Sequence, residues 1–227
     1  MGKFLDLTAS SGFVFPAYVA EPAGQPKAAV VVLQEIFGIN SHIRSVADGY
    51  AAQGYLAVAP STFHRVQPGV EIGYGPDDMT TGSALKAAVE ALPAPGVMQD
   101  IAAAILYASK AGKVGVVGYC WGGLLTWRAA CTLSGLDAAV CYYGGGMTAD
   151  DEAARQPHCP TLAHFGNQDL WIPLDTVEAF KRRQPEVPVH IYEANHGFNC
   201  DQRGSYNEAA AKLAKQRTLD FFAQHLA

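Results

Sequence analysis

Short apolar runs alternate with helical stretches along most of this chain, and this alternation restricts the fold more than any other feature. Several of the apolar runs carry no polar residue, as is usual for strands buried on both faces. The pattern predicts an α/β fold whose mostly parallel sheet has helices on both faces. Strands are expected at residues 28–33, 55–59, 114–117, 138–142, 161–165 and 189–192. Helices are expected at residues 41–53, 84–92, 99–111, 122–133, 174–183 and 207–225.

Two further segments complete the predicted organisation. Residues 12–21 alternate apolar and small residues and indicate an antiparallel edge strand. Residues 61–76 are too rich in glycine and proline for a regular element. They form either an active-site loop or a loop with only a structural role. With no internal repeat and no low-complexity linker, residues 1–227 are expected to be a single domain.

Charge and hydropathy exclude several kinds of partner. The formal charge of −5 argues against binding to a phosphate backbone, which requires clustered lysine and arginine. No apolar run reaches the roughly 18 to 20 residues that span a bilayer, and Asp6 interrupts the start where a signal peptide is apolar. We therefore expect a cytoplasmic protein with neither nucleic acid nor membrane as a partner. Its oligomeric state is left open.

The strongest local signal is Gly118-x-Cys120-x-Gly122, which follows an apolar strand and precedes an alanine-rich helix. This is the pattern of a nucleophile elbow with cysteine in the serine position. The positive end of the helix that starts at Trp121 favours thiolate over thiol at Cys120. A buried packing cysteine at a glycine-rich turn is the alternative, and the strand before and helix after argue against it.

A nucleophile needs a base and an orienting acid, and both follow in the order that this kind of fold uses. Asp169 comes after the strand at 161–165, and His196 lies in the loop between the last strand and the last helix. Taken alone, Asp169 is also a plausible helix N-cap and His196 a solvated loop residue. His164 lies within a strand, where we expect a hydrogen-bonded core residue.

The transition state of acyl transfer also needs hydrogen-bond donors for its oxyanion. The backbone N–H groups of Ile36 and Trp121 hold the two positions that supply them. Glu35 stands beside this predicted oxyanion hole, where it either accepts the thiol proton or makes a structural hydrogen bond. No ligand spacing typical of a metal and no nucleotide motif occurs, so we expect neither a metal nor a cofactor.

Together these segments resemble the dienelactone hydrolase family, the carboxymethylenebutenolidases. The resemblance covers nearly the whole chain and rests on residues 34–38, 118–123, 142–144, 166–169 and 196–198. It implies an α/β-hydrolase fold and the opening of an unsaturated lactone made during chlorocatechol degradation. Cys120 would attack the lactone carbonyl and form an acyl-enzyme that water hydrolyses. The resting thiol would pair with Glu35, which swings to accept its proton when substrate binds.

One departure from the family concerns the substrate carboxylate, which family members hold with arginines. No arginine lies between residues 66 and 127, so Arg65 and Arg203 are the candidates here, joined by Tyr143 from the 142–144 motif. If the arginines do not reach the pocket, a general carboxylesterase or thioesterase becomes the better reading. A non-catalytic thiol-based binding or redox-sensing module is a third hypothesis, but a sensor cysteine needs no ordered acid and base.

Overall fold

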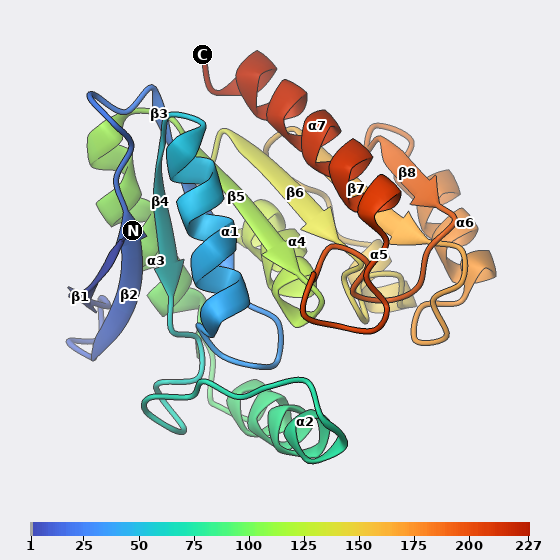
Figure 1. The fold of residues 1–227 in the computed structure, drawn as a ribbon, viewed down its shortest axis with the longest axis horizontal. Coiled ribbons are helices and arrows are strands. Elements are labelled where there is room, and N and C mark those ends of the chain that lie inside the picture. Colours follow the sequence, from blue (N-terminus) through green and yellow to red (C-terminus); the bar gives the residue numbers. More distant parts are fainter. Residues whose placement is uncertain (1) are drawn as a thin grey trace.

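The computed structural model describes residues 2–227, and its centre is an eight-stranded sheet (Figure 1). The strand order is β1-β2-β4-β3-β5-β6-β7-β8. β2 is antiparallel to both of its neighbours, whereas all pairs from β4 to β8 are parallel. The predicted α/β fold is confirmed. The strands are β1 (Lys3–Thr8), β2 (Val14–Ala20), β3 (Ala28–Leu33), β4 (Tyr55–Pro60), β5 (Val114–Tyr119), β6 (Ala138–Tyr142), β7 (Thr161–Gly166) and β8 (Val189–Tyr192).

Helices cover both faces of the sheet. α1 and α7 lie on one face, and α3, α4 and α6 lie on the other (Figure 1). Within residues 2–227, no helix combines the length and the apolar character that crossing a bilayer requires. The helices are α1 (Ser41–Ala52), α2 (Pro76–Glu90), α3 (Met98–Ala108), α4 (Trp121–Thr132), α5 (Asp150–Ala153), α6 (Leu174–Arg183) and α7 (Glu208–His225), with a 3-10 turn at Ser109–Ala111.

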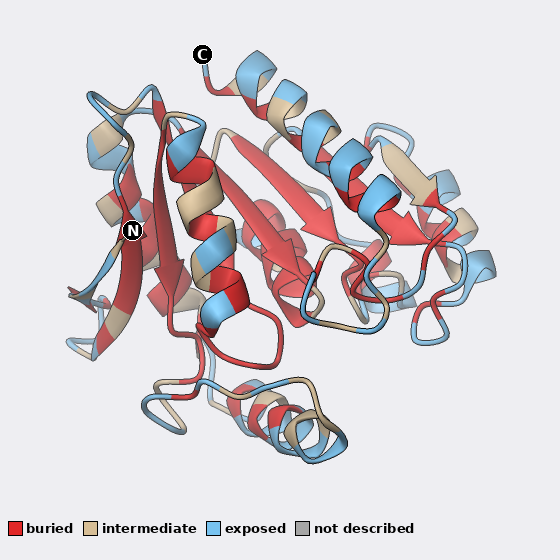
Figure 2. Ribbon diagram, in the orientation of Figure 1, coloured by how far each residue is buried: buried red, intermediate tan, exposed pale blue. Residues whose placement is uncertain are grey.

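The core lies in the middle of the sheet, where every residue of the five strands β3 to β7 is buried (Figure 2). Continuous apolar runs are stable there because helices exclude water from both faces. In β5, a Cβ at Gly115 would come within 2.8 Å of the Phe222 ring of α7. Glycine therefore lets α7 pack closely against the strand that carries Cys120.

The edge of the sheet differs from the prediction. Residues 12–21 do form an antiparallel strand, β2, but β1 pairs with it from Lys3 to Thr8 and is the true edge. Most residues of β1 are exposed or only partly buried. Such a strand has few buried positions, so its sequence carries little of the hydrophobic pattern that reveals strands.

The start of α2 also differs from the prediction. The helix begins at Pro76 rather than near residue 84. Proline is favoured at the first helical position, where its missing N–H is not needed, so Pro76 starts the helix instead of breaking it. Asp78 supports this start by accepting the Gly75 N–H over 3.0 Å. The irregular segment therefore ends at residue 75, and α2 lies beside the carboxyl ends of the parallel strands (Figure 1).

Candidate active site

Cys120 stands between β5 and α4 at a sharp turn. Its φ of 56° and ψ of −118° lie in a region that residues with side chains rarely adopt. Both flanking glycines are required, because a Cβ at Gly118 would overlap the Gly122 carbonyl and a Cβ at Gly122 would overlap that of Leu33. The Cys120 amide donates to the Tyr142 carbonyl over 3.0 Å. The structure thus has the strained elbow that the sequence predicts.

His196 and Asp169 are brought together at the same edge of the sheet. His196 lies in the loop after β8, and its Nδ1 is 2.7 Å from Oδ2 of Asp169, which follows β7. The other carboxylate oxygen, Oδ1, accepts the backbone N–H groups of Trp171 (2.8 Å) and Ile172 (3.1 Å). Asp169 therefore stabilises its own turn and also orients the imidazole. The two interpretations from the sequence, a capping residue and an orienting acid, are compatible.

The protonation of His196 reflects opposing influences. Burial lowers the pKa of His196, but the negative charge of Cys120 and hydrogen bonds with Asp169 and Cys120 raise it to about 10. The charges of the imidazole and of the Cys120 sulfur are therefore coupled. A cationic imidazole favours the thiolate form of the neighbouring sulfur, which is the nucleophilic form.

The predicted oxyanion donors lie on two sides of Cys120. Trp121 is the first residue of α4, so its backbone N–H has no acceptor within the helix. Ile36 lies in the turn after β3. Both residues line the same cavity as Cys120 and His196. Their role as donors stays a prediction.

Glu35 is fully buried and its carboxylate is held by two side chains. Arg203 Nη1 donates to Oε1 over 3.2 Å, and the Tyr74 hydroxyl donates to Oε2 over 3.4 Å. The resemblance implies a resting thiol paired with this glutamate. Among the described residues, Glu35 instead pairs with Arg203, and Cys120 lies beside His196. A guanidinium neutralises the buried carboxylate, which a neutral thiol cannot do.

The two candidate arginines are placed very differently. Arg203 lines the cavity beside Cys120 and His196. Arg65 does not line it: Nε and Nη2 each lie 2.7 Å from an oxygen of Asp100, and the guanidinium stacks on Phe13. The structure thus does not place Arg65 where a substrate-binding residue would lie. Nothing in the sequence marks Asp100 as its partner.

Tyr143 is fully buried and does not line the cavity either. Its ring lies 5.2 Å from the His196 ring and 5.1 Å from that of Phe198. Its φ of 37° is a second strained position near the site. Tyr143 therefore supports His196 from behind rather than offering a group to a ligand, contrary to its place among the substrate-binding candidates.

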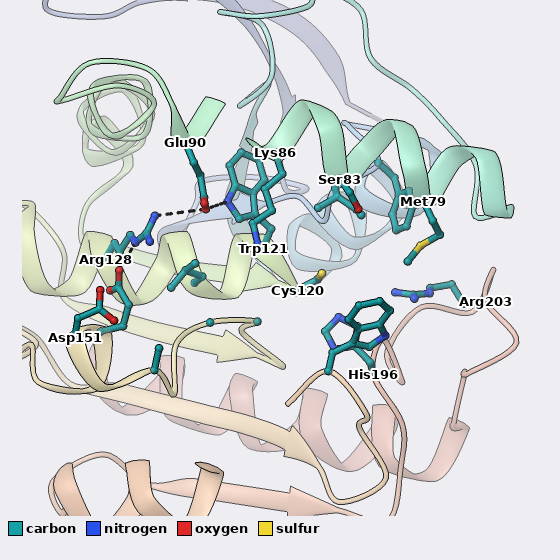
Figure 3. A pocket seen from close by; sticks show the side chains of 18 residues that line it. Met79, Ser83, Lys86, Glu90, Cys120, Trp121, Arg128, Asp151, His196 and Arg203 are labelled. Carbon is teal, nitrogen blue, oxygen red and sulfur yellow. Dashed lines mark hydrogen bonds and ion pairs between the residues drawn. The ribbon is translucent and has the colours of Figure 1, made fainter. Parts of the chain in front are cut away.

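The cavity at Cys120 has a volume of about 460 Å³, within the usual range for small-molecule sites. In Figure 3, His196 and Arg203 lie on one side of Cys120, and Glu90 and Arg128 lie toward the other end. There Glu90 accepts the Trp121 indole N–H over 3.0 Å and lies 3.6 Å from Arg128. The cavity thus joins a reactive end to a charged end.

Helix α2 and the turn after Asp169 contribute lining residues that the sequence analysis missed. α2 supplies Met79, Ser83, Lys86 and Glu90, and its early start was hidden by Pro76. Trp171 also lines the cavity although 72% of it is exposed. Its position two residues after Asp169 is the one signal that could have indicated it.

One group of side chains has the composition of a metal site. Ligand atoms of Glu35, His42 and Cys200 all lie within 4.8 Å of one another. The group includes neither Cys120 nor His196. No metal was expected from the sequence, which shows no spacing typical of metal ligands.

Comparisons with known proteins agree with this architecture. The chain matches the dienelactone hydrolase family over residues 15–226. A carboxymethylenebutenolidase of Pseudomonas putida is 34% identical over 227 residues, covering 96% of this chain and 95% of that protein. A Synechocystis protein provisionally named a carboxymethylenebutenolidase is 35% identical over 228 residues, covering 92% and 91%.

The fold leads to the same group of proteins. The crystal structure of a Klebsiella pneumoniae protein, provisionally described as a dienelactone hydrolase, is 32% identical. The two structures superpose with a TM-score of 0.84 over 99% of this chain and 98% of that one. Because the agreement spans nearly the whole chain in both sequence and fold, the protein belongs to the dienelactone hydrolase family and is a carboxylic ester hydrolase.

Proposed function

We propose that this enzyme cleaves a small lactone or ester through Cys120, with His196 and Asp169 completing a catalytic triad. The observation that carries the proposal is the position of Cys120 at a strained elbow that opens into a cavity of about 460 Å³. His196, whose pKa is raised, lies beside the sulfur and is oriented by Asp169. This is the arrangement of an activated nucleophile.

The acylation step follows from these positions. The Cys120 thiolate attacks the carbonyl carbon, and a carbon–sulfur bond forms as the carbonyl oxygen gains negative charge. The N–H groups of Ile36 and Trp121 stabilise this oxyanion. The carbon–oxygen bond to the leaving group then breaks, and His196 gives its proton to the departing oxygen. In a lactone the leaving oxygen stays attached to the acyl chain.

Hydrolysis of the acyl-enzyme uses the same groups in reverse. Neutral His196 removes a proton from water, and the water oxygen attacks the thioester carbon. The carbon–sulfur bond breaks, the carboxylic product leaves, and the Cys120 thiolate is regenerated beside a protonated His196. Asp169 stays ionised and keeps Nδ1 of the imidazole in place.

Glu35 and Arg203 connect substrate binding to the state of Cys120. Arg203 already neutralises Glu35 and also lines the cavity. A substrate carboxylate that binds Arg203 would compete with Glu35 for the guanidinium. The released carboxylate would then accept a proton from any Cys120 that is in the thiol form, and more enzyme would carry the thiolate when substrate is present.

The substrate we favour is a small lactone that carries a carboxylate, the kind of substrate that the name carboxymethylenebutenolidase describes for the Pseudomonas putida relative. A general carboxylesterase or thioesterase is the second candidate. It is favoured by one observation: Arg65 lies on Asp100, away from the cavity. The other arginine that lines the cavity, Arg128, pairs with Glu90 and Glu152 toward the far end, so no second arginine stands beside Arg203 to hold a carboxylate firmly.

A pair of substrates and a pair of variants test this function. Cys120→Ala should lower kcat on an activated aryl ester by at least about 10³-fold, whereas Cys131→Ala, a buried cysteine on α4, should not. Mass spectrometry of the wild type with a slow ester should detect an acyl group on Cys120. Turnover retained in Cys120→Ala would remove Cys120 as the nucleophile. Equal kcat/KM for a lactone carboxylate and its methyl ester would favour the general esterase.

A further inference from the structure

Glu35, His42 and Cys200 form a buried cluster of three different donor groups. Their carboxylate, imidazole and thiol atoms lie within 4.8 Å of one another. Glu35 and Cys200 are fully buried, and His42 is 3% exposed. Oxygen, nitrogen and sulfur donors of these types are those that bind zinc, with metal–ligand distances of about 2.0–2.3 Å.

His42 carries the feature that distinguishes this cluster from ordinary packing. Its Nδ1 lies 3.2 Å from Oδ1 of Asp201. Its Nε2 is buried and has no hydrogen-bond partner among the described residues. A carboxylate on one ring nitrogen holds the proton there and leaves the lone pair of the other nitrogen for a metal. An unpartnered buried nitrogen has lost its contacts with water without gaining a partner, and a metal ion would supply one.

Glu35 can join such a site without releasing its present partners. Arg203 and Tyr74 each occupy one position on the carboxylate, which has about four acceptor positions. Donor atoms around a tetrahedral zinc ion are roughly 3.3–3.6 Å apart. The three atoms of the cluster need to approach by only about 1 Å to reach that spacing. A fourth position would remain open.

A second cavity gives access to His42 from outside the active site. It has a volume of about 260 Å³ and is lined by both His42 and Asp201. The Asp201 side chain is 63% exposed, so the cavity reaches solvent at this residue. Lys212 also lines the cavity, but it pairs with Glu208 at the exposed surface of α7.

We propose that Glu35, His42 and Cys200 bind a divalent, thiol-preferring cation such as Zn²⁺, with Asp201 orienting His42. Binding displaces the proton of the Cys200 thiol to solvent, so one proton leaves for each metal bound at Cys200. The site is separate from Cys120 and His196, yet it shares Glu35 with them. Bound metal would therefore hold Glu35 away from Cys120.

Cobalt provides a direct test of the binding. In a Cys120→Ala background, which removes the catalytic thiol as a competing ligand, Co²⁺ should bind once per chain and give sulfur-to-cobalt absorption in the near ultraviolet. Adding Cys200→Ala should abolish this absorption. Adding Cys131→Ala or Cys159→Ala should leave it unchanged. Asp201→Ala should weaken Co²⁺ binding by about 10- to 100-fold.

His42→Phe should also abolish Co²⁺ binding in the Cys120→Ala background, with thermal unfolding as the check that the chain is folded. Should the His42 variant fail to fold, Cys200→Ala remains as the decisive variant. The proposal is overturned if the Cys120→Ala protein gives no sulfur-to-cobalt absorption. It is equally overturned if that absorption persists when Cys200 is removed.

The effect on catalysis rests on the proposed role of Glu35 and has its own readout. Equimolar Zn²⁺ should lower kcat/KM of the wild type at least about tenfold more than that of Cys200→Ala, each relative to the same variant with a chelator. If Co²⁺ binds but Zn²⁺ inhibits the wild type and Cys200→Ala equally, the metal site stands and its proposed effect on catalysis through Glu35 is wrong. Metal binding is measured in a variant that lacks Cys120. A negative binding result would therefore not depend on whether the proposed hydrolysis is correct.

Discussion

Glu35 and Asp169 are both buried carboxylates that follow parallel strands, and each pairs with a residue that lines the Cys120 cavity, but they are held in different ways. Asp169 accepts two backbone N–H groups of its own turn and lies 2.7 Å from His196. Glu35 is held only by side chains, at 3.2 Å from Arg203 and 3.4 Å from Tyr74. Backbone contacts move only with the loop, whereas side-chain contacts exchange by rotation. Asp169 is therefore suited to orient, and Glu35 to change partners.

The difference predicts that Asp169 is the more costly carboxylate to lose. Asp169→Asn should lower kcat by about 10³-fold, because the amide can donate to Nδ1 and so favour the wrong imidazole tautomer. The turn should survive, since the amide oxygen can still accept the N–H groups of Trp171 and Ile172. Kinetics on an aryl ester, together with the melting temperature, measure both effects.

Asp175→Asn, at an exposed carboxylate on α6, is the matched control for Asp169→Asn and should leave kcat unchanged. A loss of stability in Asp169→Asn without a loss of kcat would indicate that this residue orders only its turn.

Glu35→Gln should have a smaller and more selective effect. Glutamine keeps the shape of the side chain but is a poor proton acceptor, so acylation should slow by about 10²-fold while deacylation is unchanged. Single-turnover measurements separate the two steps. Glu71→Gln, at an exposed carboxylate paired with Arg44, is the control. An unchanged acylation rate would make Glu35 a structural residue, the alternative that the sequence analysis leaves open.

The order of Cys120, Asp169 and His196 was predictable because each lies in a turn that its own neighbours specify. Gly118 and Gly122 permit the elbow, and acid and base follow successive strands whose ends share one edge. Such features are local in sequence, so they can be recognised without knowing how distant segments pack.

Pairings between distant side chains were not predictable by the same reasoning. Arg65 pairs with Asp100, and His42 meets Cys200, across 35 and 158 positions of the chain. Their charges and donor groups are visible in the sequence, but their partners depend on how loops and helices pack. Pro76 misled the prediction of α2 for a related reason, since proline both starts and ends helices.

Removing Arg203 tests whether Glu35 depends on its partner. Arg203→Met leaves a buried carboxylate without its cation, which should cost about 3 kcal/mol in the free energy of unfolding. In the double variant with Glu35→Gln most of this loss should disappear, because no charge remains unpaired. Arg44→Met, in the exposed pair with Glu71, should cost less than about 1 kcal/mol. Additive losses in the double variant would show that Arg203 and Glu35 act independently.

The smallest expected effect concerns pH, and it separates the two carboxylates most directly. The pKa of His196 is about 10 in the folded chain and about 6.5 when unfolded. The folded chain therefore keeps a proton between these values that the unfolded chain releases. This stabilisation is fully present below about pH 6.5 and is lost as the pH rises toward 10.

Asp169 is among the main causes of this raised pKa of His196, and Glu35 is not. Between pH 7 and 10 the melting temperature of the wild type should consequently fall by a few degrees more than that of Asp169→Asn. Glu35→Gln should keep the wild-type slope. If the melting temperatures of all three proteins fall in parallel with pH, Asp169 does not stabilise a charged His196. The contrast between Asp169, which orients, and Glu35, which changes partners, would then rest on the behaviour of Glu35 alone.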